Sequence, residues 1–162
     1  MRKLLIAILA LAFANCSGQK DNAIEQAKAT KEVLKENSPG YVATSAEGYY
    51  MKAIIDGKEW VATSMMPPEE PSRIIGEKNG ESISLPYDRR DMVVGKKRNF
   101  ETYAVDLLLN DDVAIWGGHK GEMVITKIDD KSAEGNFYFT ASSDNTTKTI
   151  QVTDGFFRII FK

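Results

Sequence analysis

Short runs of alternating apolar and polar residues, separated by tight-turn dipeptides, constrain the fold of this chain more than any other feature. Apolar residues recur at every second position from 103 to 109 and again from 137 to 141. This period of two is typical of a β-strand that buries one face. Asp56-Gly57 and Asn79-Gly80 each separate two such runs. They predict hairpins, because both central residues of a type I′ turn need a positive φ.

Residues 48–162 contain about eight to ten such runs and no convincing helical pattern. The sequence therefore predicts an all-β domain, either an antiparallel β-sandwich or a small β-barrel, since a free sheet edge would invite aggregation. Asp154-Gly155 is expected to form a further turn. We also expect a turn over residues 129–135, with Gly135 supplying an unusual φ, and a Gly-rich loop over 117–121.

The first fifteen residues have the composition of a signal peptide. Arg2 and Lys3 precede an uninterrupted apolar run from Leu4 to Phe13. A helix of this length spans roughly 15 Å, about half of the hydrocarbon core of a bilayer, so the run is too short to cross a membrane. We therefore expect residues 1–15 to be removed on export.

Cys16 follows this run closely and is the only cysteine in the sequence. Phe13-Ala14-Asn15-Cys16 resembles the lipobox of bacterial lipoproteins, in which cleavage precedes a cysteine that receives fatty acyl chains such as palmitate. The sequence predicts that Cys16 is lipidated and attaches the chain to the membrane. The alternative is cleavage after Ala14, which would release a soluble protein.

Residues 16–47 are expected to form a tether between the lipidated cysteine and a β domain over residues 48–162. Residues 17–22 resemble the polar export signal of surface lipoproteins, and a plain polar spacer is the alternative. Residues 23–37, rich in Ala, Lys and Glu, predict a short solvated helix that ends at Asn37-Ser38-Pro39-Gly40.

Charge and composition exclude several classes of function. The chain carries 21 Lys and Arg against 23 Asp and Glu, a net charge of −2, which argues against binding of nucleic acid. The single cysteine excludes an intramolecular disulfide and a cysteine-rich zinc site, and the single histidine leaves little for metal or triad chemistry. No Gly-x-Ser-x-Gly elbow occurs, so we expect no enzymatic activity, no cofactor and no metal.

Four side chains are candidate ligand-binding groups. Trp116 and His119 flank the Gly-rich segment, where an aromatic face and an imidazole can contact a sugar or another polar ligand. Trp60 and Tyr138 lie in predicted strands. Three of them also have a structural interpretation, which is an exposed turn for His119 and a partly buried core position for the two tryptophans.

Three weaker patterns also suggest functional sites. Asp111-Asp112, together with His119, would suit a hydrolase, although acidic pairs are common in turns. Residues 130–135 imitate the opening of a calcium-binding loop, but Ala141 stands where the closing Glu would be. A basic cluster would meet an anionic glycan or lipid headgroup, or form a solvated loop and strand edge. The cluster consists of Arg89, Arg90, Lys96, Lys97 and Arg98.

Four blocks of the sequence resemble recurring strand-turn-strand motifs of an uncharacterised Bacteroidota lipoprotein family. These blocks are Ile55–Thr63, Gly121–Asp129, Glu134–Ala141 and Val152–Phe157. They are spread over most of residues 49–161, from Ile55 to Phe157. The resemblance implies an exported, lipid-anchored β domain, and because the family carries no established activity, no functional residue transfers to this chain.

These features predict a lipid-anchored protein of the outer membrane, on its periplasmic or cell-surface face. The β domain is expected to be a non-enzymatic binding or structural module whose partner is an envelope protein or a glycan. Two alternatives stay open, namely a barrel that holds a small apolar ligand and a hydrolase.

Overall fold

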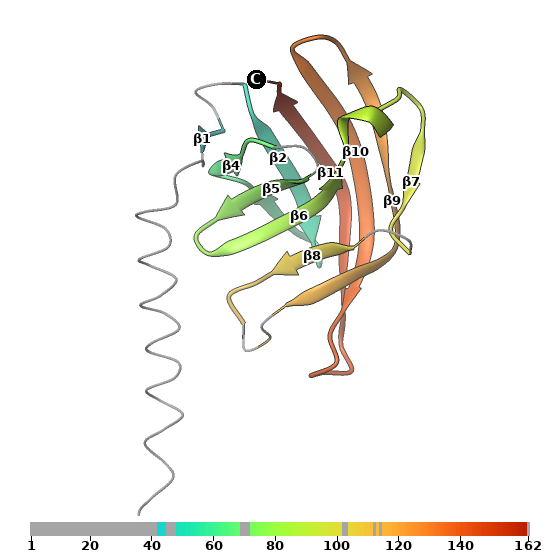
Figure 1. Cartoon of the computed structure of the whole chain (residues 1–162). Helices are drawn as coiled ribbons and strands as arrows, with labels where there is room; N and C mark the ends of the chain where they lie inside the picture. Colours follow the sequence, from blue (N-terminus) through green and yellow to red (C-terminus); the bar gives the residue numbers. More distant parts are fainter. Residues whose placement is uncertain are drawn as a thin grey trace, which may run out of the picture. The chain divides into compact units, whose positions relative to one another are not determined.

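Antiparallel β-strands make up most of the structure, a computed structural model that describes residues 42–44, 48–68, 72–101, 104–111, 113 and 115–161. Every pairing between named strands is antiparallel (Figure 1), which confirms the predicted all-β antiparallel class. The predicted signal peptide, Cys16 and the helical tether lie outside the described residues. Within those residues, no helix is long and apolar enough to span a membrane.

The described part of the chain forms eleven strands, slightly more than predicted, and one turn of 3₁₀ helix. The elements in chain order are β1 (Val42–Ala43), β2 (Tyr50–Ile55), β3 (Lys58–Val61), β4 (Ser64–Met66), β5 (Ser72–Lys78), β6 (Glu81–Tyr87), η1 (Arg89–Asp91), β7 (Lys97–Asn99), β8 (Val105–Leu108), β9 (Trp116–Ile128), β10 (Ser132–Ser142) and β11 (Thr149–Ile160).

Both tight hairpins predicted from turn dipeptides are present. Between β2 and β3, Asp56 and Gly57 have φ values of 45° and 78°. Between β5 and β6, Asn79 and Gly80 have φ values of 51° and 88°. Positive φ at both central residues is the signature of a type I′ turn, whose twist matches that of the paired strands.

The strands form one sheet in the order β1-β4-β5-β6-β8-β9-β10-β11-β2-β3, with β7 added to β9. The last strand of this path, β3, leads directly into β4, the second strand, because only Ala62 and Thr63 separate them in the chain. The amide of Ala62 donates to the carbonyl of Met51 in β2 (2.9 Å), and the amide of Thr63 donates to the carbonyl of Glu77 in β5 (2.8 Å). The sheet is therefore strongly curled, which is closer to the predicted small barrel than to two separate sheets (Figure 1).

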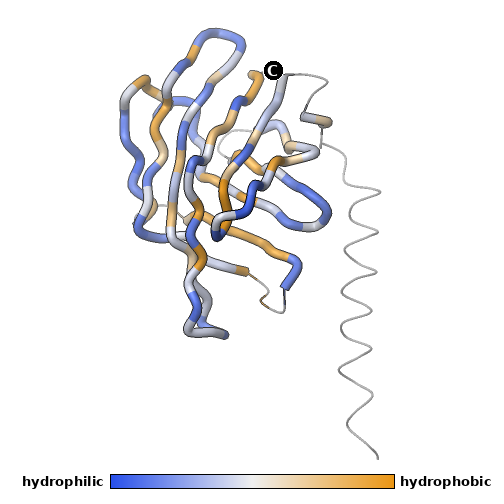
Figure 2. The backbone as a smooth tube through the Cα atoms, turned by 180° about the vertical axis from the view of Figure 1, so that it is seen from behind, coloured by the Kyte–Doolittle hydropathy of each residue, from blue (hydrophilic) through white to orange (hydrophobic). Residues whose placement is uncertain are grey.

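Apolar side chains from strands all around the curled sheet fill its interior. Buried and more exposed residues alternate along β2 and β10, as the period of two predicts, and the hydropathy of the strands varies accordingly (Figure 2). Ten apolar side chains of the described residues have no exposed area, so they contact neither solvent nor a water-sized void. They are Met51, Met65, Ile74, Ile83, Leu85, Leu107, Ala133, Ala141, Phe157 and Ile159.

One predicted turn is wrong, and another is shorter than predicted. Asp154 and Gly155 lie inside β11, where the register shifts against both neighbouring strands and Asp154 has a φ of 50°. They form a β-bulge, which increases the local curl of the sheet. The turn predicted over residues 129–135 is present at residues 129–131, between β9 and β10, but Gly135 lies inside β10 and has no positive φ. A side chain at Gly135 would lie 2.6 Å from the ring of Phe157, so close packing rather than a turn requires glycine there.

Candidate functional site

The structure separates the four predicted ligand-binding residues into two pairs. The indoles of Trp60 and Trp116 point into the core and are only 3% and 2% exposed. His119 and Tyr138 lie on the outer face of the sheet, where Tyr138 is 49% exposed. The core packing of both tryptophans fits the structural interpretation, and the four residues do not form one site.

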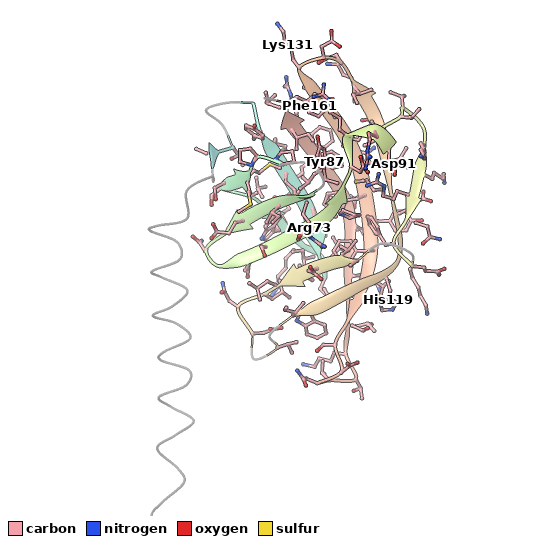
Figure 3. The ribbon with its side chains drawn as sticks, in the orientation of Figure 1. Arg73, Tyr87, Asp91, His119, Lys131 and Phe161 are labelled. Carbon is pink, nitrogen blue, oxygen red and sulfur yellow. The ribbon has the colours of Figure 1, made fainter. Side chains whose placement is uncertain are left out.

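The predicted Gly-rich loop is also wrong, because residues 116–121 belong to the long strand β9. Gly117 and Gly118 are paired with β8 on one side and with β10 on the other. Lys120 and Gly121 lie at a register shift against β10, where Lys120 has a φ of 48°, so this part of the strand is irregular but is not a loop. His119 lies opposite Thr140, with its Nδ1 3.5 Å from Oγ of Ser142. It occupies the end of the sheet away from Asp91 and Lys131 (Figure 3).

Asp111, one of the residues suggested for hydrolysis, is engaged in structural contacts. Its Oδ1 accepts a hydrogen bond from the amide of Val113 at 3.0 Å, and its Oδ2 accepts one from Nε1 of Trp116 at 3.0 Å. The second of these bonds gives the buried Trp116 indole its partner. Asp112 lies outside the described residues.

The buried indole N–H of Trp60, by contrast, has no hydrogen-bond partner among the described residues. Trp60 lines a hollow of about 380 Å³ together with residues of the Asp56-Gly57 hairpin, the β5–β6 hairpin and the end of β8. An unpaired buried donor costs free energy of about 1–3 kcal/mol, which marks Trp60 as a point of lower stability in the core.

The segment proposed as a calcium-binding loop is a side-chain-capped turn between β9 and β10. Oδ1 of Asp129 accepts hydrogen bonds from the amides of Lys131 and Ser132, each at 2.8 Å. These bonds hold the pKa of Asp129 below its usual range. Glu134 faces Arg158 at 3.8 Å instead of a common centre. Within the described residues, no three acidic, histidine or cysteine side chains are grouped as a metal site would need.

The basic cluster is not a free positive surface, because each of its side chains has a partner. Within it, the guanidinium of Arg90 holds the pKa of Asp88 below its usual range. The exposed members of the cluster fit the solvated loop and strand edge, whereas Arg98 is buried, at 7% exposed. The contacts are Arg89 with the ring of Phe161, Arg90 with Asp88, Lys96 and Arg98 with Asp91, and Lys97 with Glu122.

A groove of about 840 Å³ crosses the outer face of the sheet, over β2, β11, β10, β9 and β7. We call it the outer groove. These five strands follow one another along one side of the curl (Figure 1). The bulge at Asp154-Gly155 lies in it, so the same irregularity that curls the sheet also shapes this surface. Its lining is Tyr50, Lys52, Lys97, Glu122, Val124, Thr126, Asn136, Phe137, Tyr138, Asp154, Gly155 and Phe156.

Aromatic rings lie on both sides of the outer groove. Tyr50 of β2 and Phe156 of β11 are tilted against each other, with ring centroids 6.1 Å apart. Tyr138 of β10 projects outward between the buried Phe137 and Phe139. Aromatic rings turned to the outside of a sheet add nothing to its core, and they are the residues that binding sites use for large apolar contact.

Charged side chains lie beside these rings. Nζ of Lys97 lies 2.9 Å from Oε1 of Glu122, and this hydrogen bond, with smaller contributions that include the nearby Tyr138, raises the pKa of Lys97. Lys52, on β2, and Asp154, on β11, are the other charged residues of the groove. The groove therefore offers two ammonium groups, which donate hydrogen bonds, and two carboxylates, which accept them.

Sequence reasoning named two of the groove residues as candidates, Tyr138 and, within the basic cluster, Lys97. The others come from strands up to about a hundred residues apart, and nothing local brings them together. One usable signal was the Phe156-Phe157 pair, since adjacent strand residues face opposite sides and one of two neighbouring aromatics must point outward.

Comparison with known proteins identifies one family, which is defined by a domain of unknown function. Neither the curated proteins nor the solved structures include a significant match to this chain. One family model covers residues 48–160, which is more than half of the chain and includes every strand that lines the outer groove. The chain therefore belongs to the family defined by a domain of unknown function, DUF6252.

Proposed function

We propose that this chain is an outer-membrane lipoprotein, anchored through Cys16, whose β domain is a non-enzymatic binding module that uses the outer groove. The observation that carries the proposal is the set of outward rings, Tyr50, Tyr138 and Phe156, in one concave surface. Exposed aromatic side chains gathered in a groove are characteristic of ligand-binding surfaces.

The charges of the groove favour binding over catalysis. Glu122, its most enclosed carboxylate, is held by Lys97 at 2.9 Å. The raised pKa of Lys97 keeps this side chain protonated at neutral pH, so it is unsuited to act as a general base. Asp111, the residue considered for hydrolysis, is bound to Trp116 elsewhere in the fold.

The outer groove is also a better candidate than the interior for holding a ligand. Ten apolar side chains inside the curl have no exposed area, which leaves no water-sized space against them. The apolar-ligand alternative requires such space, whereas the outer groove offers about 840 Å³ open to solvent.

Two measurements on the full chain in its native envelope test this proposal. Intact mass spectrometry of the membrane-extracted protein should show a chain that begins at Cys16 and carries fatty acyl groups. The Cys16→Ser variant should leave the membrane on carbonate washing. An unacylated mature chain, or retention of the Cys16→Ser variant, would contradict the anchor.

The second measurement concerns the groove. A photo-crosslinking amino acid in place of Tyr138 should link the protein to an envelope component. The same amino acid in place of Ile115, which is exposed to a similar degree but lies outside the groove, should not. Equal crosslinking at the two positions would contradict binding at the outer groove.

A further inference from the structure

We propose that the occupant of the outer groove is a neutral oligosaccharide of several sugars. The inference rests on the proposed function and adds the chemical class of the ligand. Three properties of the groove carry it, namely its charge balance, its arrangement of aromatic rings and its position on the sheet face.

The charge balance argues for a ligand without net charge. Lys52 and Lys97 are offset by Glu122 and Asp154, so the groove has no excess of either sign. A phosphate-rich or uronate-rich polymer would meet two carboxylates for every two cations and gain little. A neutral hydroxyl both donates and accepts, so it can use the carboxylates and the ammonium groups alike.

Uncharged polar groups extend the same pattern. Asn136 and Thr126 lie in the groove with the phenol groups of Tyr50 and Tyr138. An amide and hydroxyls of this kind donate and accept hydrogen bonds without favouring a charged partner. A row of such groups matches the hydroxyl rim of a sugar ring better than it matches an apolar or an ionic ligand.

The aromatic rings supply the complementary contact. The flat faces of a pyranose carry C–H groups, which pack on the electron-rich faces of aromatic rings. Tyr50 and Phe156 stand together over β2 and β11, and Tyr138 stands over β10 beside the Lys97–Glu122 pair. Rings on more than one strand, with polar groups between them, suit a chain of sugars that contacts the groove at several points.

The dimensions of the groove exceed those of one sugar. It crosses five neighbouring strands, β2, β11, β10, β9 and β7. Neighbouring strands are about 4.8 Å apart, so the groove extends over roughly 19 Å. A ligand that contacts all five strands therefore has to contain several linked sugars.

The position of the groove argues against the common way of binding an extended peptide. β11, β10 and β9 each have paired neighbours on both sides, and β2 lies between β11 and β3. Over these four strands the groove therefore exposes a sheet face rather than unpaired backbone, and a peptide cannot be added there as a further strand. Among the described strands that line the groove, β7, at one end, is the one with a single paired neighbour. Recognition has to come from side chains, as it does for sugars.

The test measures binding of purified full-length protein, in detergent micelles, to neutral hexasaccharides by isothermal titration calorimetry. The probes are cellohexaose, maltohexaose, mannohexaose and chitohexaose, with hexagalacturonate as the anionic comparison. We expect at least one neutral hexasaccharide to bind, with a dissociation constant that changes less than twofold between 50 and 500 mM NaCl, because no net charge is screened. The anionic probe should bind at least tenfold more weakly.

Matched variants tie this binding to the groove. Tyr138→Ala should weaken it at least tenfold, whereas Ile115→Ala, which removes a side chain exposed to a similar degree elsewhere, should leave it unchanged. Tyr138→Phe keeps the ring and should retain most of the affinity. Unchanged thermal unfolding of the three variants would show that the affinities report on the contact and not on folding.

The outcomes separate this inference from the proposed function. No binding of any neutral hexasaccharide, binding only of the anionic probe, or binding insensitive to Tyr138→Ala would overturn the inference. If crosslinking at position 138 then still captured an envelope component, the groove would remain a binding surface with another kind of partner. If crosslinking also failed, the proposed function would fall with the inference.

Discussion

Nζ of Lys97 lies 2.9 Å from Oε1 of Glu122 inside the outer groove, whereas the adjacent Lys96 pairs with Asp91 at 3.2 Å outside it. The two lysines are neighbours in the chain, both are exposed and both are ion-paired. They differ in whether the ammonium belongs to the groove, which makes them a matched pair for testing it.

Replacing Lys97 with Met should weaken hexasaccharide binding roughly 5- to 10-fold, the equivalent of about one lost hydrogen bond, with little change in thermal unfolding. The ammonium is exposed, so its pairing with Glu122 adds little to folding. Calorimetry and thermal melts measure the two effects. Lys96→Met is the control, and an equal loss of affinity in both variants would show that the effect does not arise in the groove.

The bulge in β11 requires a glycine at position 155. A Cβ added there would lie 2.5 Å from both the ring and the carbonyl oxygen of Phe137, so Gly155→Ala should destabilise the fold by about 2–3 kcal/mol. Urea unfolding measures this free energy. Gly117→Ala in β9 is the control, because its Cβ would meet nothing nearer than 3.8 Å. Similar stability of the two variants would contradict the packing of the bulge.

The two buried tryptophans should respond differently to loss of the indole N–H. Trp116→Phe removes a 3.0 Å hydrogen bond to Asp111, whereas Trp60→Phe removes a buried donor that has no partner among the described residues. We expect Trp116→Phe to be more destabilising than Trp60→Phe by about 1–3 kcal/mol in chemical unfolding. The reverse order would mean that the Trp60 indole is hydrogen-bonded in solution.

Asp129 should make the stability of the fold depend on acid pH. Hydrogen bonds from the amides of Lys131 and Ser132 lower the pKa of this carboxyl in the folded state. Its pKa in the unfolded chain is about 3.9. A lowered folded pKa adds stability that is fully present above the unfolded value and is lost as the pH falls through the folded one.

The difference in melting temperature between the wild type and Asp129→Ala should therefore be constant from pH 5 to 8 and shrink below about pH 4. Asp130→Ala, in the same exposed turn, is the control for removing a surface charge. A difference that grows on acidification would have the wrong sign for a carboxylate stabilised by amide donors.

Local chemistry explains which parts of the fold could be predicted from sequence. Asp56-Gly57 and Asn79-Gly80 were predicted correctly because the φ values of a type I′ turn depend on those residues themselves. Asp154-Gly155 has the same dipeptide signature but lies in a bulge. Whether such a pair turns the chain or bends a strand depends on the partners of β11, which the local sequence does not contain.

The candidate site was harder to predict because it is assembled from distant strands. Tyr50 and Phe156 are more than a hundred positions apart and meet only because β2 pairs with β11. The glycines at 117 and 118 suggested a loop beside Trp116 and His119, yet their pairing partners hold them in β9. Composition marked aromatic residues as candidates, and only the register of the sheet shows which of them face outward.

The most direct test of binding at the outer groove is hydroxyl-radical footprinting of the full-length protein in intact cells and after purification in detergent. In cells, where the groove is occupied, oxidation of Tyr138 should fall at least threefold relative to the purified protein, while oxidation of the exposed Ile115 outside the groove should not change. Equal oxidation of Tyr138 in the two preparations, or equal protection of Tyr138 and Ile115 in cells, would contradict a ligand bound at this surface.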